Sequence, residues 1–227
     1  MRQHLHIINY LPVRFAANEV QALERQICYD FKDGLLSESV KNEFLTMANS
    51  ITQGNSNEWV VCFIPASTTE KTLRRYSQLA NAFRQHGFEV ANDAITNAFD
   101  TEAGHLNGKS ATPIEAFLFS PNSFIGKKVI LIDDVITRGT TFNMTADKLE
   151  ALGAISVTGL FLAKTVNPDY EAQKIVKHRP ADDYYYDYEE DTYDRYHGSY
   201  AQDVEGWSDQ EIDEVFDGDP DAYWNID

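Results

Sequence analysis

The 227-residue sequence lacks the features that mark membrane proteins and secreted, disulfide-rich proteins. Its two cysteines, Cys28 and Cys62, are too few for a disulfide framework or a cysteine-rich zinc site. No apolar run approaches the roughly 18 residues that cross a bilayer, and the N-terminus has no secretory signal. Hydrophobic residues make up 43% and charged residues 24% of the chain, as in globular proteins. We expect a folded cytoplasmic protein with reduced thiols and no membrane contact.

The C-terminal segment has almost no basic residues, unlike the rest of the chain. Residues 182–227 carry 17 acidic residues and one basic residue, whereas residues 1–181 carry 19 and 18. The same segment holds eight of the 12 tyrosines, together with Trp207 and Trp224. This charge repels nucleic acid, so direct nucleic-acid binding is not expected, while the aromatic rings favour burial. We expect a partly ordered tail that docks on its own core or on a protein partner; a nucleic-acid mimic and a receptor-read tag are alternatives.

Strand-like and helix-like patterns alternate along the rest of the chain. Helical spacing between residues 17 and 51, interrupted at Asp33-Gly34, predicts a helical hairpin. Continuous apolar runs predict buried strands at 59–64, 129–132 and 157–163, and 88–95 reads as a further strand. Helices are expected after Ser67, where Glu70 completes a capping box, and across Phe142 to Leu152. This alternation predicts an α/β fold with a doubly wound, mainly parallel sheet.

The end of the 129–132 strand carries the residues best suited to chemistry. Asp133 and Asp134 follow it directly, and adjacent carboxylates raise each other's pKa unless cations or hydroxyl donors meet them. A divalent cation or a sugar diol would resolve this cost. Hydroxyls and a permissive backbone then precede a helix start, where a phosphate monoester binds well; the residues are Thr137, Gly139, Thr140 and Thr141.

Residues 129–141 resemble the fingerprint of the type I phosphoribosyltransferases, which is four apolar residues, an acidic pair, two apolar residues and a small hydroxyl-rich loop. The resemblance implies binding of 5-phosphoribosyl-1-pyrophosphate (PRPP) with Mg²⁺. Asp133 and Asp134 would take the ribose hydroxyls and the metal, and the loop 137–141 would take the 5′-phosphate. Arg138 stands where Thr or Ser is more usual, which bears on how the loop closes. A buried strand, turn and helix without a ligand is the alternative.

The 59–64 strand end resembles the pyrophosphate loop of the same family. The resemblance implies that backbone N–H groups and basic side chains bind pyrophosphate there: Ala66, Ser67 and Thr68, supported by Lys71, Arg74 and Arg75. The alternative is a capped helix with a solvated basic face. The polar segment 97–112 would close over the pyrophosphate, and its Lys109 joins Asp133 and Asp134 as an expected catalytic residue.

Arg74-Arg75-Tyr76 and the segment 115–128 further resemble the ComF-like branch, over about 59–162. Members of that branch often begin with paired-cysteine zinc motifs, which this sequence lacks, so a role in DNA uptake does not transfer with the resemblance. We expect an N-terminal helical hood over the base in residues 1–57, a phosphoribosyltransferase-like core in 58–181, and the acidic tail in 182–227.

Two functions follow from the resemblance. The first is a homodimeric phosphoribosyltransferase that transfers phosphoribose to or from a purine, pyrimidine or related base by displacement at the anomeric carbon. The second is a non-catalytic regulator on the same fold that senses PRPP or a nucleotide, linked to DNA uptake or nucleic-acid metabolism.

Overall fold

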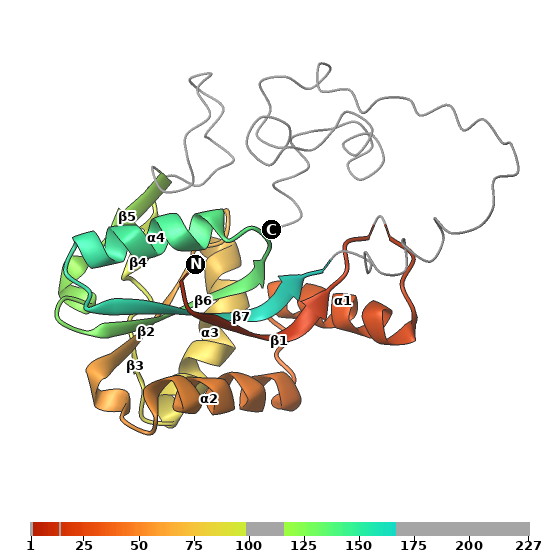
Figure 1. The fold of residues 1–227 in the computed structure, drawn as a ribbon, viewed down its shortest axis with the longest axis horizontal. Coiled ribbons are helices and arrows are strands. Elements are labelled where there is room, and N and C mark those ends of the chain that lie inside the picture. Colours follow the sequence, from red (N-terminus) through yellow and green to blue (C-terminus); the bar gives the residue numbers. More distant parts are fainter. Residues whose placement is uncertain (1, 14, 99–115, 167–227) are drawn as a thin grey trace, which may run out of the picture. The chain divides into compact units, whose positions relative to one another are not determined.

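A computed structural model describes residues 2–13, 15–98 and 116–166 (Figure 1). The expectations for Lys109, for most of the 97–112 loop and for the 182–227 tail lie outside these residues. The chain divides into two units: Met1–Tyr10 with Asn18–Thr165, and Leu11–Ala17 with Val166–Asp227. Of the second unit, a short turn is described, in which the Phe15 N–H donates to the Pro12 carbonyl at 3.1 Å.

A five-stranded parallel sheet forms the centre of this unit. Its spatial order is β1 (His4–Tyr10), β7 (Ser156–Thr165), β6 (Lys128–Ile136), β2 (Trp59–Phe63) and β3 (Glu89–Val90). The three inner strands are apolar on both faces, as the continuous runs in the sequence predict. The α/β class and the mainly parallel sheet are therefore confirmed. Strand β1 comes from the range expected to form a hood and is an edge strand of this sheet.

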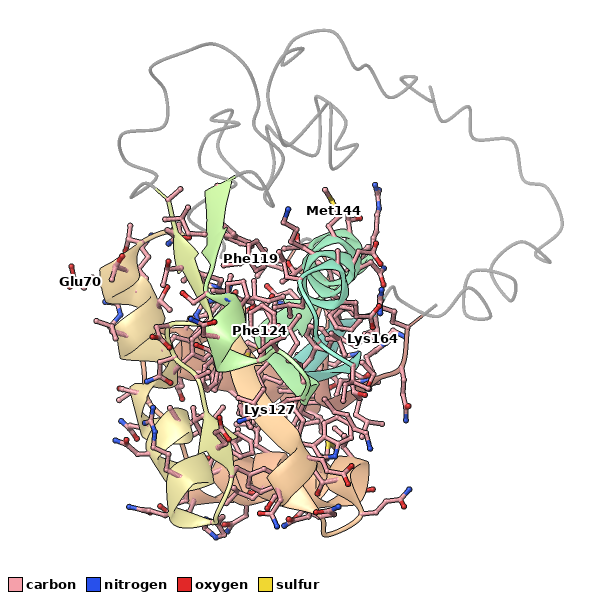
Figure 2. The ribbon with its side chains drawn as sticks, turned by 90° about the vertical axis from the view of Figure 1, so that its left-hand side faces the viewer. Glu70, Phe119, Phe124, Lys127, Met144 and Lys164 are labelled. Atoms are coloured by element: carbon pink, nitrogen blue, oxygen red, sulfur yellow. The ribbon has the colours of Figure 1, made fainter. Side chains whose placement is uncertain are left out.

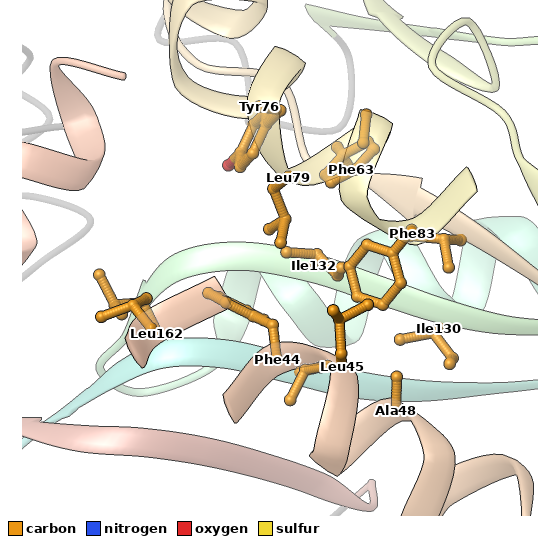
Figure 3. Packing of buried hydrophobic residues seen from close by; sticks show 14 of the residues in the cluster. Phe44, Leu45, Ala48, Phe63, Tyr76, Leu79, Phe83, Ile130, Ile132 and Leu162 are labelled. Carbon is orange, nitrogen blue, oxygen red and sulfur yellow. The ribbon is translucent and has the colours of Figure 1, made fainter. Parts of the chain in front are cut away.

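Three helices cover one face of the sheet and a fourth covers the other (Figure 1). On the first face lie α1 (Glu19–Lys32), α2 (Glu38–Thr52) and α3 (Thr69–Gln85). Figure 3 shows how Phe44 from α2, Phe83 from α3 and Ile130 from β6 pack together there. Helices α1 and α2 thus have their buried side chains in the core beneath the sheet.

Helix α4 (Thr140–Ala151) packs on the opposite face through Phe142, Ala146 and Leu149. Phe124 is fully buried in the same cluster, and Figure 2 shows it on the side of the sheet that α4 covers. The predicted helix and its apolar face are confirmed. Because both faces of the sheet are covered by helices, its strand ends are the places where loops meet solvent.

The strand expected at 88–95 is wrong as a single element. The chain forms the two-residue strand β3, turns at Asn92-Asp93, and then forms β4 (Ile95–Asn97), which pairs antiparallel with β5 (Phe117–Phe119) in a separate small sheet. Asn and Asp favour turns because their short side chains satisfy the backbone locally, and this outweighs the apolar residues on either side. Short 3₁₀ turns at Ser56–Glu58 and Pro121–Ser123 precede β2 and β6.

Two further details of the helices differ from their sequence patterns. Val20 and Leu23 of α1 and Leu73 of α3 are exposed, although their spacing places them on apolar stripes. The side chains that α1 buries are Cys28 and Phe31. No helix within the described ranges is both long and apolar enough to cross a bilayer.

Candidate anion and ribose site at the end of β6

Strand β6 extends beyond the end of its neighbour β2. The two acidic residues lie on this extension of β6. The β2–β6 ladder ends at the pair Phe63–Ile132, and Asp133 and Asp134 follow at once. On its other side β6 stays paired with β7 as far as Ile136. The acidic pair therefore lies at the carboxyl edge of the sheet, where parallel α/β folds bind ligands.

Asp134 is enclosed by groups of this chain. Its Oδ2 lies 2.9 Å from Nη1 of Arg75 and 3.7 Å from Nζ of Lys32. Its Oδ1 accepts the Val135 N–H at 2.6 Å. The side chain is 7% exposed and that of Arg75 is 3% exposed. Oδ1 is thus hydrogen-bonded, whereas Oδ2 is buried beside two cations and accepts no hydrogen bond from the described residues.

Two opposing effects act on the pKa of Asp134. Burial on its own raises the pKa of a carboxyl group, but the Arg75 and Lys32 charges outweigh it and hold the pKa of Asp134 below its ordinary value. Asp134 therefore stays ionised at neutral pH. Burial lowers and Asp134 raises the pKa of Arg75, with a net rise, so the pair is charged on both sides.

Asp133 has a different environment from its neighbour. Its side chain is half-buried, and its Oδ1 accepts hydrogen bonds from the Tyr76 hydroxyl at 3.1 Å and from the Asp134 N–H at 2.8 Å. Tyr76 is buried, and burial together with the Asp133 charge raises its pKa, so its hydroxyl keeps its proton and remains a donor. Asp133 is thus oriented by Tyr76 while part of its surface faces solvent.

Consecutive residues of α3 therefore meet the consecutive carboxylates of β6. Arg75 forms an ion pair with Asp134, and the Tyr76 hydroxyl donates a hydrogen bond to Asp133. The sequence analysis expected a divalent cation or a sugar diol to offset the two negative charges. In the structure Arg75, Lys32 and Tyr76 do so within the chain.

The loop between β6 and α4 ends in a helix start without a side-chain cap. Gly139 is the N-cap residue and has φ +74°, the left-handed conformation that glycine adopts readily. Among the described residues, no side chain accepts a hydrogen bond from the first N–H groups of α4. Thr137, Arg138 and Thr140 are exposed around it, Thr141 is half-buried, and the Thr137 hydroxyl bonds that of Thr165 at 2.9 Å. The first N–H groups of a helix have no partner within the helix, so this uncapped end has donors and partial positive charge suited to an anion.

The loop between β2 and α3 uses its polar groups internally. The capping box expected from Ser67 and Glu70 is wrong, because the N-cap residue of α3 is Thr68, whose side chain accepts the Lys71 N–H at 3.1 Å. The Ala66 N–H donates to the Thr72 hydroxyl at 3.0 Å, and that hydroxyl donates to the Thr68 carbonyl at 2.8 Å. Asn97 holds the Ala66 carbonyl at 2.7 Å. Ala66 is buried and its N–H is engaged, so it does not present a donor to an anion as expected.

The basic residues after this loop separate. Arg75 faces inward to Asp134, and is not a surface residue beside the loop as the sequence predicts. Arg74 is half exposed, and its Nη2 lies 3.8 Å from Oδ1 of Asp33. Lys71 and Ser67 are both half-buried. Sequence reasoning missed the roles of Lys32, Tyr76, Thr72 and Asn97, because each acts through a partner that is distant in sequence or through a loop conformation.

The described residues supply few ligands for a metal ion. Within residues 2–13, 15–98 and 116–166 there is no group of three or more His, Cys, Asp or Glu side chains placed to hold an ion. Mg²⁺ is often bound through one or two carboxylates, with substrate phosphates and water completing the shell. Asp133 fits that pattern, whereas the carboxylate of Asp134 is buried in ion pairs with Arg75 and Lys32.

The sequence matches no model of a known protein family. No curated protein matches it significantly either. Among solved structures, the chain is similar to a purine phosphoribosyltransferase from Pyrococcus horikoshii, with 11% identity, 66% of this chain and 97% of that chain covered, and a TM-score of 0.32. It is also similar to a hypoxanthine-guanine phosphoribosyltransferase from Schistosoma mansoni solved with IMP, with 11% identity, 74% and 83% coverage, and a TM-score of 0.34.

Proposed function

We propose that this chain binds PRPP at the end of β6 and acts as a phosphoribosyltransferase-like protein. The observation that carries the proposal is the start of α4, which has no side-chain cap and lies a few residues after the half-buried carboxylate of Asp133. A helix start supplies N–H donors and partial positive charge for a phosphate. A carboxylate accepts hydrogen bonds from sugar hydroxyls. Together they suit a ribose 5-phosphate unit.

Each group has a defined task in this proposal. The N–H groups at Thr140 and Thr141, with their hydroxyls, hold the 5′-phosphate. Asp133, oriented by Tyr76, accepts a hydrogen bond from a ribose hydroxyl. Mg²⁺, when bound, would neutralise the pyrophosphate, with Asp133 as its protein ligand among the described carboxylates at this end of β6. Fixed donors and charges of this kind are effective because they need no rearrangement as charge develops on the ribose.

Transfer of phosphoribose to or from a purine, pyrimidine or related base is the reaction that such a site would serve. The expected roles of Lys109, of a homodimer, of the acidic tail and of a ComF-like relationship belong to the same proposal.

A PRPP-sensing regulator without turnover is the second candidate. It is favoured by the enclosure of Asp134, since both its oxygens are committed to Arg75, Lys32 and the Val135 N–H. A site with a single outward carboxylate retains the contacts for recognition and has fewer for the displacement step.

Thermal denaturation of the full chain with ligands tests the binding proposal. A ligand that binds the folded state raises Tm. At a hundredfold excess over Kd, it raises the free energy of unfolding by about 2.7 kcal/mol. We expect PRPP with Mg²⁺ to raise Tm, and ribose 5-phosphate alone to do so more weakly. Pyrophosphate alone is expected to have little effect, because the β2–α3 loop uses its own donors. An unchanged Tm at millimolar PRPP would contradict the proposal.

Incubation with PRPP, Mg²⁺ and a panel of bases then separates the two candidates. Pyrophosphate release that depends on one base identifies a transferase and its acceptor. Tight PRPP binding without release with any base identifies the regulator.

A further inference from the structure

We infer that the two adjacent aspartates have separate roles: Asp133 is the carboxylate that faces the ligand, and Asp134 is an internal counter-ion that never contacts it. Tyr76 is the positioning residue for Asp133. This inference rests on the proposed function and assigns the residues within that site. It differs from the expectation that both carboxylates bind ribose hydroxyls and metal.

The enclosure of Asp134 is the first step. One oxygen lies between the cations of Arg75 and Lys32, and the other accepts a backbone N–H. A ribose hydroxyl or a metal ion would have to displace the Arg75 guanidinium to reach it. That would leave the cation of Arg75, whose side chain is 3% exposed, without its partner, which is strongly unfavourable in a protein interior.

The attachment of Asp133 is the second step. Its Oδ1 receives the Tyr76 hydroxyl and the Asp134 N–H, so two donors from different elements fix the plane of the carboxylate. Tyr76 is in turn held by ring stacking with Phe63, with ring centroids 4.7 Å apart, and by the Arg75 guanidinium over its ring at 5.7 Å. Asp133 keeps partial exposure within this frame. It is therefore both oriented and accessible.

The alternation of side chains along β6 does not separate the two residues, because both carboxylates reach partners on α3. Their separation comes from what α3 presents. A cation that is itself buried pairs with Asp134 and closes around it. A hydroxyl donates a hydrogen bond to Asp133, whose side chain is half-buried and not enclosed as that of Asp134 is. Arg75 and Tyr76 are adjacent on α3, and their different side chains give Asp134 and Asp133 different roles.

Four variants of the full chain test the inference, with PRPP and Mg²⁺ affinity measured by calorimetry and Tm by circular dichroism. Asp133→Asn is expected to fold with a Tm close to that of the wild type and to bind PRPP at least tenfold more weakly. Asp134→Asn is expected to lose many degrees of Tm and, measured at 10 °C where it is folded, to keep its affinity within about threefold. If Asp134→Asn does not fold, Arg75→Met/Asp134→Leu removes both buried charges and serves instead, with the same expected affinity.

Tyr76→Phe keeps the stacked ring and removes the hydroxyl. It is expected to weaken PRPP binding about three- to tenfold. In Asp133→Asn/Tyr76→Phe the second change should add no further loss, because the hydroxyl acts through Asp133. A merely structural role for the hydroxyl would give the same loss in both backgrounds.

Equal losses of affinity in folded Asp133→Asn and in the folded Asp134 variant, or additive losses for Asp133 and Tyr76, would overturn the inference while leaving the proposed function intact. No PRPP binding by the wild type would overturn both.

Discussion

Helices α3 and α4 both begin just after a buried parallel strand, but their first N–H groups meet different surroundings. At α3 the side chain of Thr68 caps the helix, and Thr72 and Asn97 occupy the polar groups of the preceding loop. At α4 the cap position is a left-handed glycine, and no described side chain caps the helix. The chain caps one helix start with its own side chain, and the other is the one to which we assign the phosphate in the proposed function. A helix start at a strand end is thus informative only once its own capping groups are counted.

The two regions are joined by the ion pair between Arg75 of α3 and Asp134 of β6, and breaking it is expected to give the largest effect. Arg75→Met leaves Asp134 buried with Lys32 alone, and loss of one partner from a buried pair costs about 3–5 kcal/mol of unfolding free energy. Urea unfolding at pH 7 measures it. The matched control is the neighbouring Arg74→Met, since the half-exposed Arg74–Asp33 pair should contribute about 0–1 kcal/mol.

The difference in unfolding free energy between the wild type and Arg75→Met depends on pH, and its sign can be worked out. The pKa of Asp134 in the folded chain lies below its ordinary value of about 3.9, so the unfolded chain takes up the proton first as pH falls. The stabilisation is complete above the ordinary value and is lost as pH falls through the lower, folded-state pKa. The gap between wild type and Arg75→Met should therefore narrow in acid. A gap that is constant from pH 7 into this range would contradict the pairing.

A second, smaller effect is expected at the start of α4. Gly139→Val forces a branched side chain into the left-handed region, which costs roughly 1–2 kcal/mol, and its Cβ would lie 3.3 Å from Cδ1 of Ile136. We also expect at least a tenfold loss of PRPP affinity. Gly126→Val is the control, because Gly126 has a similar φ of +72° with nothing within 4 Å of an added Cβ. It should lose stability and keep its affinity; equal affinity losses in both variants would refute the phosphate site.

The smallest effect is expected at the caps. Thr68→Ala removes the α3 cap and should lower the unfolding free energy by about 1 kcal/mol without changing PRPP affinity. Thr140→Ala at the start of α4 should change stability by less than about 0.5 kcal/mol, since its hydroxyl caps nothing, while lowering affinity. Urea midpoints and calorimetry on the two variants measure both quantities. The reverse pattern would show that the two helix starts have exchanged roles.

Much of the fold was predictable because local patterns and tertiary structure agree in it. The apolar runs around Val61, Ile130 and Leu160 become inner strands, and Phe142 and Leu149 face the core as their spacing predicts. The prediction of one strand over residues 88–95 was wrong because a turn at residues 92–93 divides this segment. The pairing of His4–Tyr10 with β7 could not be predicted, since strand order depends on contacts between distant segments.

The neighbourhood of the candidate site's residues was predictable, and the contacts among them were less so. The acidic pair and the glycine-containing loop do lie together at the end of β6. The sequence gives no local sign that Arg75 turns inward, because a charge run on a helix is usually a solvated face. Burial of Arg75 depends on its ion pair with Asp134, which lies on another element of the fold.

The pairing of β1 with β7 also has a consequence for the order in which the protein can form during synthesis. His4 lies beside Gly159, about 150 residues later in the chain, and Tyr10 lies beside Thr165. At translation rates of about 5–20 residues per second, the first strand waits roughly 10–30 s before its partner leaves the ribosome. Residues 4–10 are an exposed, strand-forming segment throughout that time. This edge of the sheet can be completed only after β7 has been made, so residues 4–10 pair later than the segments made just after them.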